Sequence, residues 1–136
     1  MSRKICCLLI LSLACSCLSG CQKSQKPAKE ASLDFTVVTD SEIPEELQTL
    51  IDERKEKPFT LTFSDQAYLY VVKGYGKQNC SGYQITIHDF YKSPEGIYFN
   101  SELFGPKEDN PDARESYPYI VIKTEYTDLP LIFADE

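Results

Sequence analysis

Cys80 and His88 are the two residues whose side chains could together carry out nucleophilic chemistry. A thiol activated by a nearby imidazole attacks acyl groups, and His88 is the single histidine of the chain. The two residues are eight positions apart, and an extended chain of that length spans roughly 26 Å at about 3.3 Å per residue. Apolar and polar residues alternate after Gly82, which predicts a strand and not a reversal that would bring the pair together. We therefore predict a surface histidine and no catalytic pair.

The acidic segment at residues 108–112 has a composition that could attract a cation. It lacks the spaced ligands, central glycine and terminal glutamate of an EF-hand loop, so a solvated loop is the prediction. The chain also has no glycine-rich phosphate-binding loop before a helix and no nucleophile elbow. We expect no metal, no cofactor and no enzymatic activity.

Tyrosine is the remaining residue type that could form a site, with nine in the chain. A flat ring covers a pleated sheet well, and this structural role accounts for most of them. Tyrosine is also enriched at protein interfaces, and two tyrosines flank the glycine-containing segment 74–82. We predict partner-binding residues in and beside this segment: Tyr75, Asn79, Ser81, Gly82 and Tyr83.

The first twenty residues have the build of a secretory signal. Arg3 and Lys4 precede an uncharged, apolar run at residues 5–18, which is shorter than the about 20 residues of a membrane-spanning helix. Residues 18–21, Leu-Ser-Gly-Cys, resemble the lipobox of bacterial lipoproteins. That resemblance implies cleavage after residue 20 and lipid on Cys21, which would hold the protein on the extracytoplasmic face of a cell membrane. The alternative is an ordinary secretory signal with an incidental cysteine.

The net charge and the cysteine positions limit which partners and which disulfides can be expected. The formal net charge of -7 becomes -9 once Arg3 and Lys4 are removed with residues 1–20. An acidic chain repels phosphate backbones, so nucleic acid is not expected to bind. Cys80 is the only cysteine outside the first 21 residues, so no disulfide framework is predicted. The polar segment that follows Cys21 predicts a flexible spacer at residues 21–32, followed by one domain at residues 33–136.

One amphipathic helix is predicted near the start of that domain. Apolar residues follow the spacing of a single helix face: Ile43, Leu47, Leu50 and Ile51. Asp40 or Ser41 is the expected N-cap, and Pro58 is expected to end the helix.

The rest of the domain has the patterns of strands. These are predicted at residues 33–39, 59–63, 67–72, 83–87, 97–104, 117–123 and 130–133. Turns are predicted at residues 64–66 and 95–96, and a polar loop at residues 105–116. This order indicates a mainly β fold, either an antiparallel sandwich or a partly open barrel, with one N-terminal helix.

Segments between residues 65 and 123 resemble the C-terminal domain of the PrcB family of protease-complex subunits. Residues 68–72 form an apolar run that is followed by Gly74, and residues 79–87 enter an alternating strand through a Gly-Tyr pair. Residues 117–122 read Tyr-Pro-Tyr followed by an apolar run. This resemblance implies a non-catalytic accessory protein that associates with or stabilises a secreted subtilisin-like protease.

The Gly82-Tyr83 pair also resembles the loops of chagasin-like cysteine-protease inhibitors, which are β-barrels. That resemblance implies an alternative function, inhibition of a protease through residues 79–83. Both alternatives describe a protein that binds another protein and is tethered through Cys21.

Overall fold

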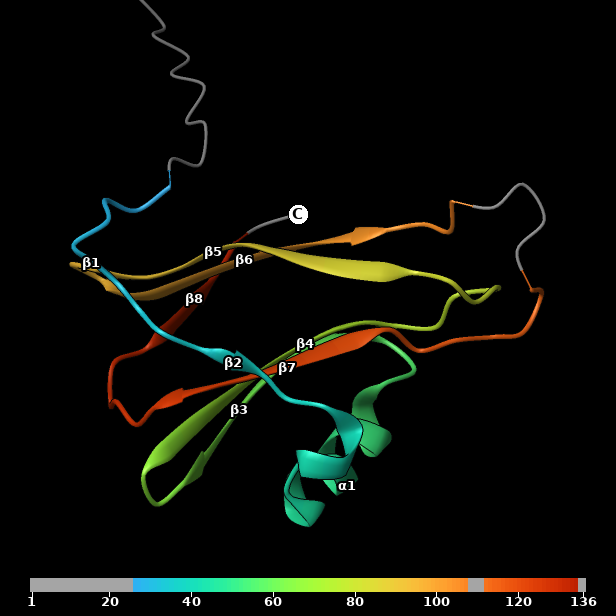
Figure 1. The fold of residues 1–136 in the computed structure, drawn as a ribbon, viewed down its shortest axis with the longest axis horizontal. Helices are drawn as coiled ribbons and strands as arrows, with labels where there is room; N and C mark the ends of the chain where they lie inside the picture. The colour runs from blue at the N-terminus through green and yellow to red at the C-terminus, as the bar shows by residue number, and fades with distance from the viewer. Residues whose placement is uncertain (1–25, 108–111, 135–136) are drawn as a thin grey trace, which may run out of the picture.

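The computed structural model describes residues 26–107 and 112–134 (Figure 1). The predicted signal peptide at residues 1–20 and the predicted lipidation site Cys21 lie outside the described residues, as does most of the acidic segment 108–112. Within the described part, no helix is both long enough and apolar enough to cross a membrane.

Within the described residues, eight strands form two sheets of four strands each. In spatial order, sheet A contains β1 (Ala31–Ser32), β5 (Gln84–Ser93), β6 (Gly96–Phe104) and β8 (Leu131–Phe133). In spatial order, sheet B contains β2 (Thr36–Val37), β7 (Tyr119–Glu125), β4 (Tyr68–Tyr75) and β3 (Pro58–Asp65). The sheets stack face to face, and helix α1 (Glu45–Arg54) covers the outer face of sheet B (Figure 1). The molecule therefore has three layers.

The predicted mainly β sandwich is confirmed, and the barrel alternative is not adopted because the two sheets stay separate. One strand pairing differs from the predicted antiparallel arrangement, since β8 runs parallel to β6. After β7 the chain crosses from sheet B to sheet A through residues 126–130. It enters sheet A at the end where β6 begins, because Leu131 lies beside Ile97. That direction of entry makes the pair parallel.

The predicted amphipathic helix forms, but it begins later than expected. Asp40 and Ser41 belong to a short 3₁₀ helix, Asp40–Glu42, and Pro44 occupies the N-cap of α1. A proline disfavours helical backbone in the residue before it, and Ile43 is extended with φ -72° and ψ 127°. A short 3₁₀ helix and the extended residue Ile43 therefore precede α1.

The side chains of α1 and sheet B form the first of two hydrophobic clusters. Leu47 and Ile51 are fully buried, and Ile43 is buried beside them. They pack with Tyr70, Val72 and Val121 of sheet B and with half-buried residues of β3: Phe59, Leu61 and Phe63. The alternation of β4 and β7 directs these residues toward the helix and their neighbours in sequence toward sheet A.

The second cluster fills the space between the sheets. From sheet B it takes Val71 and Ile122, and from sheet A it takes Phe90, Ile97 and Phe99. The ring of Phe99 makes edge contacts with those of Phe90 and Phe133, with centroids 6.2 and 5.7 Å apart. Sheet B is thus apolar on both faces, which explains the near-continuous burial along β4.

The ordered domain begins before residue 33, where the sequence placed its boundary. The last residues of the predicted spacer form β1, and Ser32 pairs with Tyr91. Lys26 forms an ion pair with Asp89 at 2.8 Å, and the Tyr91 hydroxyl donates to the Pro27 carbonyl at 2.6 Å. The predicted strand at residues 33–39 shortens to β2, because the chain leaves sheet A after Ser32 and pairs with sheet B from Thr36.

Candidate functional site

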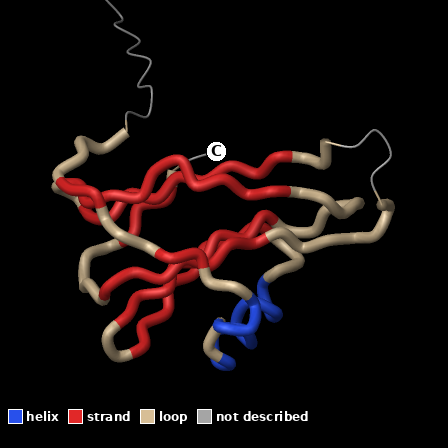
Figure 2. Tube along the Cα trace, in the orientation of Figure 1, coloured by secondary structure: helices blue, strands red, loops and turns tan. Residues whose placement is uncertain are grey.

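Two of the segments that connect the two sheets lie together at one end of the sandwich (Figure 2). The first crossover loop, residues 76–83, leads from β4 in sheet B to β5 in sheet A. The second crossover loop, residues 105–118, leads back from β6 to β7 and is described at residues 105–107 and 112–118. We call this end of the molecule the loop end. It contains four of the five residues predicted to bind a partner.

Hydrogen bonds hold the two crossover loops to one another. Gln78 and Ser116 exchange two backbone hydrogen bonds of 2.8 and 3.1 Å. The Ser116 hydroxyl donates to the carbonyl of Cys80 at 2.6 Å, and the amide of Ser81 donates to the carbonyl of Asp112 at 3.0 Å. Backbone groups that are bonded in this way resist displacement. The first crossover loop is therefore a braced surface.

The predicted binding residues of this loop differ in exposure. Asn79 and Gly82 are exposed, while Ser81 and Tyr83 are half-buried. Gly82 has φ +92°, which favours glycine, and a Cβ at this position would lie 3.0 Å from Pro106 of the second loop. The loop end therefore offers a polar side chain, a bare stretch of backbone and part of an aromatic ring on one surface.

Tyr83 is held by its neighbours on both sides. A side-chain hydrogen bond with Cys80 raises the pKa of the Tyr83 hydroxyl above its usual value of 10.0. Its ring lies beside Gly105, where an added Cβ would be 3.9 Å away. A tyrosine that is already ordered loses little conformational freedom when a partner binds, which suits a contact residue.

Tyr75 does not join this surface, contrary to the sequence prediction. It is only 9% exposed, and its hydroxyl lies 2.6 Å from the Ser101 hydroxyl in β6. This hydrogen bond joins sheet B to sheet A. The Lys73 ammonium lies over the Tyr75 ring, 5.5 Å from its centroid. Because Tyr75 ends β4 with its side chain directed between the sheets, its role is to hold them together at the loop end.

His88 and Cys80 have different partners. The His88 Nε2 lies 2.7 Å from a Glu102 carboxylate oxygen on the neighbouring strand, and His88 is exposed as predicted. The Cys80 thiol forms a side-chain hydrogen bond with Tyr83. An open cavity of about 560 Å³ lies beside His88, lined also by Tyr75, Gln78, Asn100, Ser101, Glu102 and Leu103. Among the described residues, no group of three or more potential metal ligands is present.

The class of protein that these observations define is a three-layer β sandwich with a braced loop end. Residues 69–125 match the family model described as PrcB C-terminal, which supports a PrcB-family domain in this part of the chain. The matched region runs from β4 to β7 and so includes both crossover loops. No curated protein and no solved structure matches the chain.

The sequence did not identify the second crossover loop as part of the loop end. The residues that brace the first loop come from the second one: Asp112, Glu115 and Ser116. The sequence predicted only a polar loop there. Lys77 and Glu115 form an ion pair of 2.8 Å across the two loops, and opposite charges are the one signal of this contact that the sequence carries. Charges are too common in the chain for that signal to identify a pair.

Proposed function

We propose that this chain is a non-catalytic, lipid-anchored accessory protein of the cell envelope that binds a protein partner through its loop end. The observation that carries the proposal is the position of this end relative to the start of the described chain. β1 pairs with Tyr91 and Lys92, near the far end of β5, whereas β5 begins at the loop end with Gln84. The start of the described chain and the proposed binding surface therefore lie at opposite ends of sheet A (Figure 1).

Residues 26–32, which contact β5, also limit how far the domain can move from a lipidated Cys21. Lys26 and Pro27 contact β5, so five residue steps connect Cys21 to the fold. These steps reach at most ~18 Å at about 3.6 Å each. Lipid on Cys21 would therefore hold the domain close to the bilayer with its loop end available to a partner.

The partner that the PrcB resemblance implies is a secreted subtilisin-like protease, which this protein would stabilise. The match to PrcB C-terminal covers the loop end and supports this choice. The alternative, inhibition through residues 79–83, needs the same loop to enter an active site. The hydrogen bonds that the first crossover loop forms with Asp112 and Ser116 keep it against the second crossover loop. This favours docking on a partner's surface over insertion into an active site.

The experiment is a pull-down from solubilised membranes with the full chain as bait. Tyr83→Ala removes a half-buried ring at the loop end and is expected to lower partner recovery at least about tenfold, as truncation of a hot-spot tyrosine does. Tyr126→Ala is the matched control, because Tyr126 is 51% exposed and lies at the opposite end of sheet B, just after β7. Equal recovery with both variants contradicts the proposed site.

Two further measurements complete the test. The thermal unfolding midpoint shows whether Tyr83→Ala is folded; unfolding would make Tyr83 a core residue and withdraw it from the site. Cys21→Ser is expected to release the protein from membranes, and continued membrane association would contradict lipid anchoring. A captured protease whose yield rises with the protein supports an accessory role, and a fall in its turnover supports inhibition.

A further inference from the structure

The edge strand β3 is the longest free strand edge among the described residues. Sheets A and B end in four edge strands, of which β1 and β2 have two residues each and β8 has three. β3 has eight residues and pairs only with β4. Every second residue of such an edge directs its backbone N–H and C=O groups away from the sheet, where they can pair with another strand.

The middle of β3 lacks the features that usually protect an edge, although Pro58 begins the strand and Asp65 ends it. Protected edges are short, bulged or charged, or are covered by a loop. Residues 59–64 contain no charge and no proline, and β3 pairs with β4 without a bulge. Phe59, Leu61 and Phe63 are only half-buried against α1, so a neighbouring strand would complete their cover.

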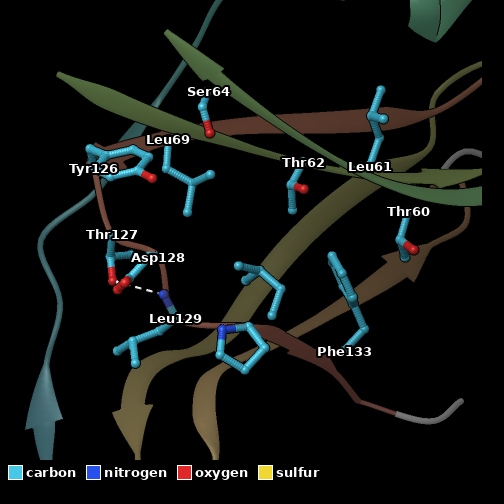
Figure 3. A pocket seen from close by; sticks show the side chains of 12 residues that line it. Thr60, Leu61, Thr62, Ser64, Leu69, Tyr126, Thr127, Asp128, Leu129 and Phe133 are labelled. Carbon is cyan, nitrogen blue, oxygen red and sulfur yellow. Dashed lines mark hydrogen bonds between the residues drawn. The ribbon is translucent and has the colours of Figure 1, made fainter. Parts of the chain in front are cut away.

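The inner side of this edge is open. A cavity of about 500 Å³ lies between β3 and residues 126–133 (Figure 3). Thr60 and Thr62 lie on its β3 side, and Phe133 lies across from them (Figure 3). A strand added to β3 would therefore meet hydroxyl groups on this face and apolar side chains on the face toward α1.

The sequence along β3 is nearly palindromic about Leu61. Residues 57–65 read Lys-Pro-Phe-Thr-Leu-Thr-Phe-Ser-Asp. In an antiparallel pair of two such strands centred on Leu61, Phe59 lies opposite Phe63 of the second copy and Thr60 lies opposite Thr62 of the second copy. Opposed residues of an antiparallel pair point to the same face, so apolar side chains meet apolar ones and hydroxyls meet hydroxyls.

The same register pairs opposite charges at both ends. Continued by one residue beyond the start of β3, this register places Lys57 opposite Asp65 of the second copy, and the two-fold symmetry repeats this pair at the other end. Both residues are exposed, and neither forms an ion pair within the described part of the chain. A register shifted by one residue would place apolar side chains of β3 on the hydroxyl face.

We propose that β3 is a self-association site, where it pairs antiparallel with β3 of a second copy and joins the two B sheets into one eight-stranded sheet. The occupant is this chain because its own edge supplies the complementary pattern of apolar, hydroxyl and charged residues. The contact is small for a protein interface, since eight residues span roughly 27 Å at about 3.4 Å each, and the association is correspondingly weak. Confinement of both copies to a membrane by Cys21 lipid would raise their effective concentration.

Charge reversal at the two ends tests this register. Lys57→Asp places like charges opposite each other at both ends of the pair, and so does Asp65→Lys. Each single variant is expected to raise the dimer dissociation constant at least about tenfold in sedimentation of the full chain in detergent. The double variant restores opposite charges and is expected to regain dimerisation, as is an equimolar mixture of the two single variants. Lys107→Asp, a reversal at an exposed residue of the loop end, is the control that leaves the dissociation constant unchanged.

Three outcomes would overturn the proposal. The wild-type chain could remain monomeric at every concentration, the single variants could dimerise as well as wild type, or the mixture and the double variant could fail to recover. Capture of an extended segment from an unlike protein at β3 of a monomeric chain would also replace the second copy as the occupant. Tyr83→Ala leaves the dimer unchanged and Lys57→Asp leaves partner recovery unchanged, so failure here is separate from failure of the proposed function.

Discussion

The two ends of the sandwich are held together by different kinds of contact. We call the end away from the crossover loops the anchor end; it contains the turn between β5 and β6 and the segment 126–130. There the contacts are buried: Ser93 is 2% exposed and its hydroxyl donates to the Gly96 carbonyl at 3.0 Å, while the Ile97 amide donates to the Pro130 carbonyl at 2.8 Å. At the loop end, hydrogen bonds join the crossover loops and leave Asn79 exposed.

This difference indicates where a substitution should affect stability and where it should affect binding. Around Gly96 at the anchor end, tight contact with Pro130 leaves little room for a larger side chain. At the loop end, hydrogen bonds between backbone groups hold the two crossover loops together, and apart from Gly76 and Gly82, which have positive φ, they should tolerate changes of side chain. Stability should therefore respond most strongly at the anchor end, and the following variants test that expectation.

Gly96→Ala is expected to have the largest effect. Gly96 has φ +151°, which side chains rarely adopt, and a Cβ there would collide with the carbonyl oxygen of Pro130. The strained backbone and the overlap together should destabilise the fold by about 3 kcal/mol. A thermal melt of the full chain should show a midpoint lower by at least ~10 °C.

Gly105→Ala is the matched control at the loop end. An added Cβ would meet only the Tyr83 ring, at 3.9 Å, which is ordinary van der Waals contact. Its midpoint should stay close to that of wild type, with a change within about 0.5 kcal/mol. Similar losses for the two glycine variants would contradict the contrast between the ends.

Local patterns in the sequence were enough to predict most elements of this fold. The face made by Ile43, Leu47, Leu50 and Ile51 predicted α1, although Leu50 is only half-buried. The alternation at residues 83–87 predicted the start of β5. Helix and strand periods are properties of neighbouring residues, so one sequence contains them. The same alternation also led to the prediction that His88 is exposed, and the structure confirms it.

Contacts between distant segments could not be predicted from the sequence. Gln78 pairs with Ser116 across 38 positions, and Tyr91 contacts Pro27 across 64. Nothing in these residue types identifies their partners, because backbone hydrogen bonds are open to any residue. Tyr75 was assigned to the binding surface for the same reason: its position beside Gly76 suggested a loop, whereas the partner that buries it, Ser101, lies 26 positions away.

Tyr75→Phe measures how much the loop end depends on its link between the sheets. The variant keeps the ring and removes the hydroxyl that lies 2.6 Å from the Ser101 hydroxyl. One lost hydrogen bond should reduce stability by about 1 kcal/mol, less than the loss at Gly96. Chemical denaturation of the full chain checks this value. A loss as large as that of Gly96→Ala would show that the loop end is as tightly constrained as the anchor end.

Lys26→Ala should give the smallest effect and a distinctive dependence on pH. A hydrogen bond from the Lys26 ammonium holds the pKa of Asp89 below its usual value, and Asn100 also donates to this carboxylate at 3.0 Å. The pKa of Asp89 is thus lower in the folded state than in the unfolded state. The stabilising contribution is present above the unfolded value and is lost as pH falls through the folded value.

Thermal melts from about pH 7 down to about pH 3 should therefore separate wild type from Lys26→Ala only at the upper part of the range. The difference should be small because the Lys26 side chain is 60% exposed, and exposed ion pairs contribute little. Lys29→Ala is the control, since Lys29 is exposed and forms no ion pair among the described residues. Curves for Lys26→Ala that run parallel to wild type at every pH would mean that residues 26–30 stay on β5 without the Asp89 contact. The β1 pairing and the hydrogen bond to Pro27 would then be what fixes the start of the domain beside sheet A.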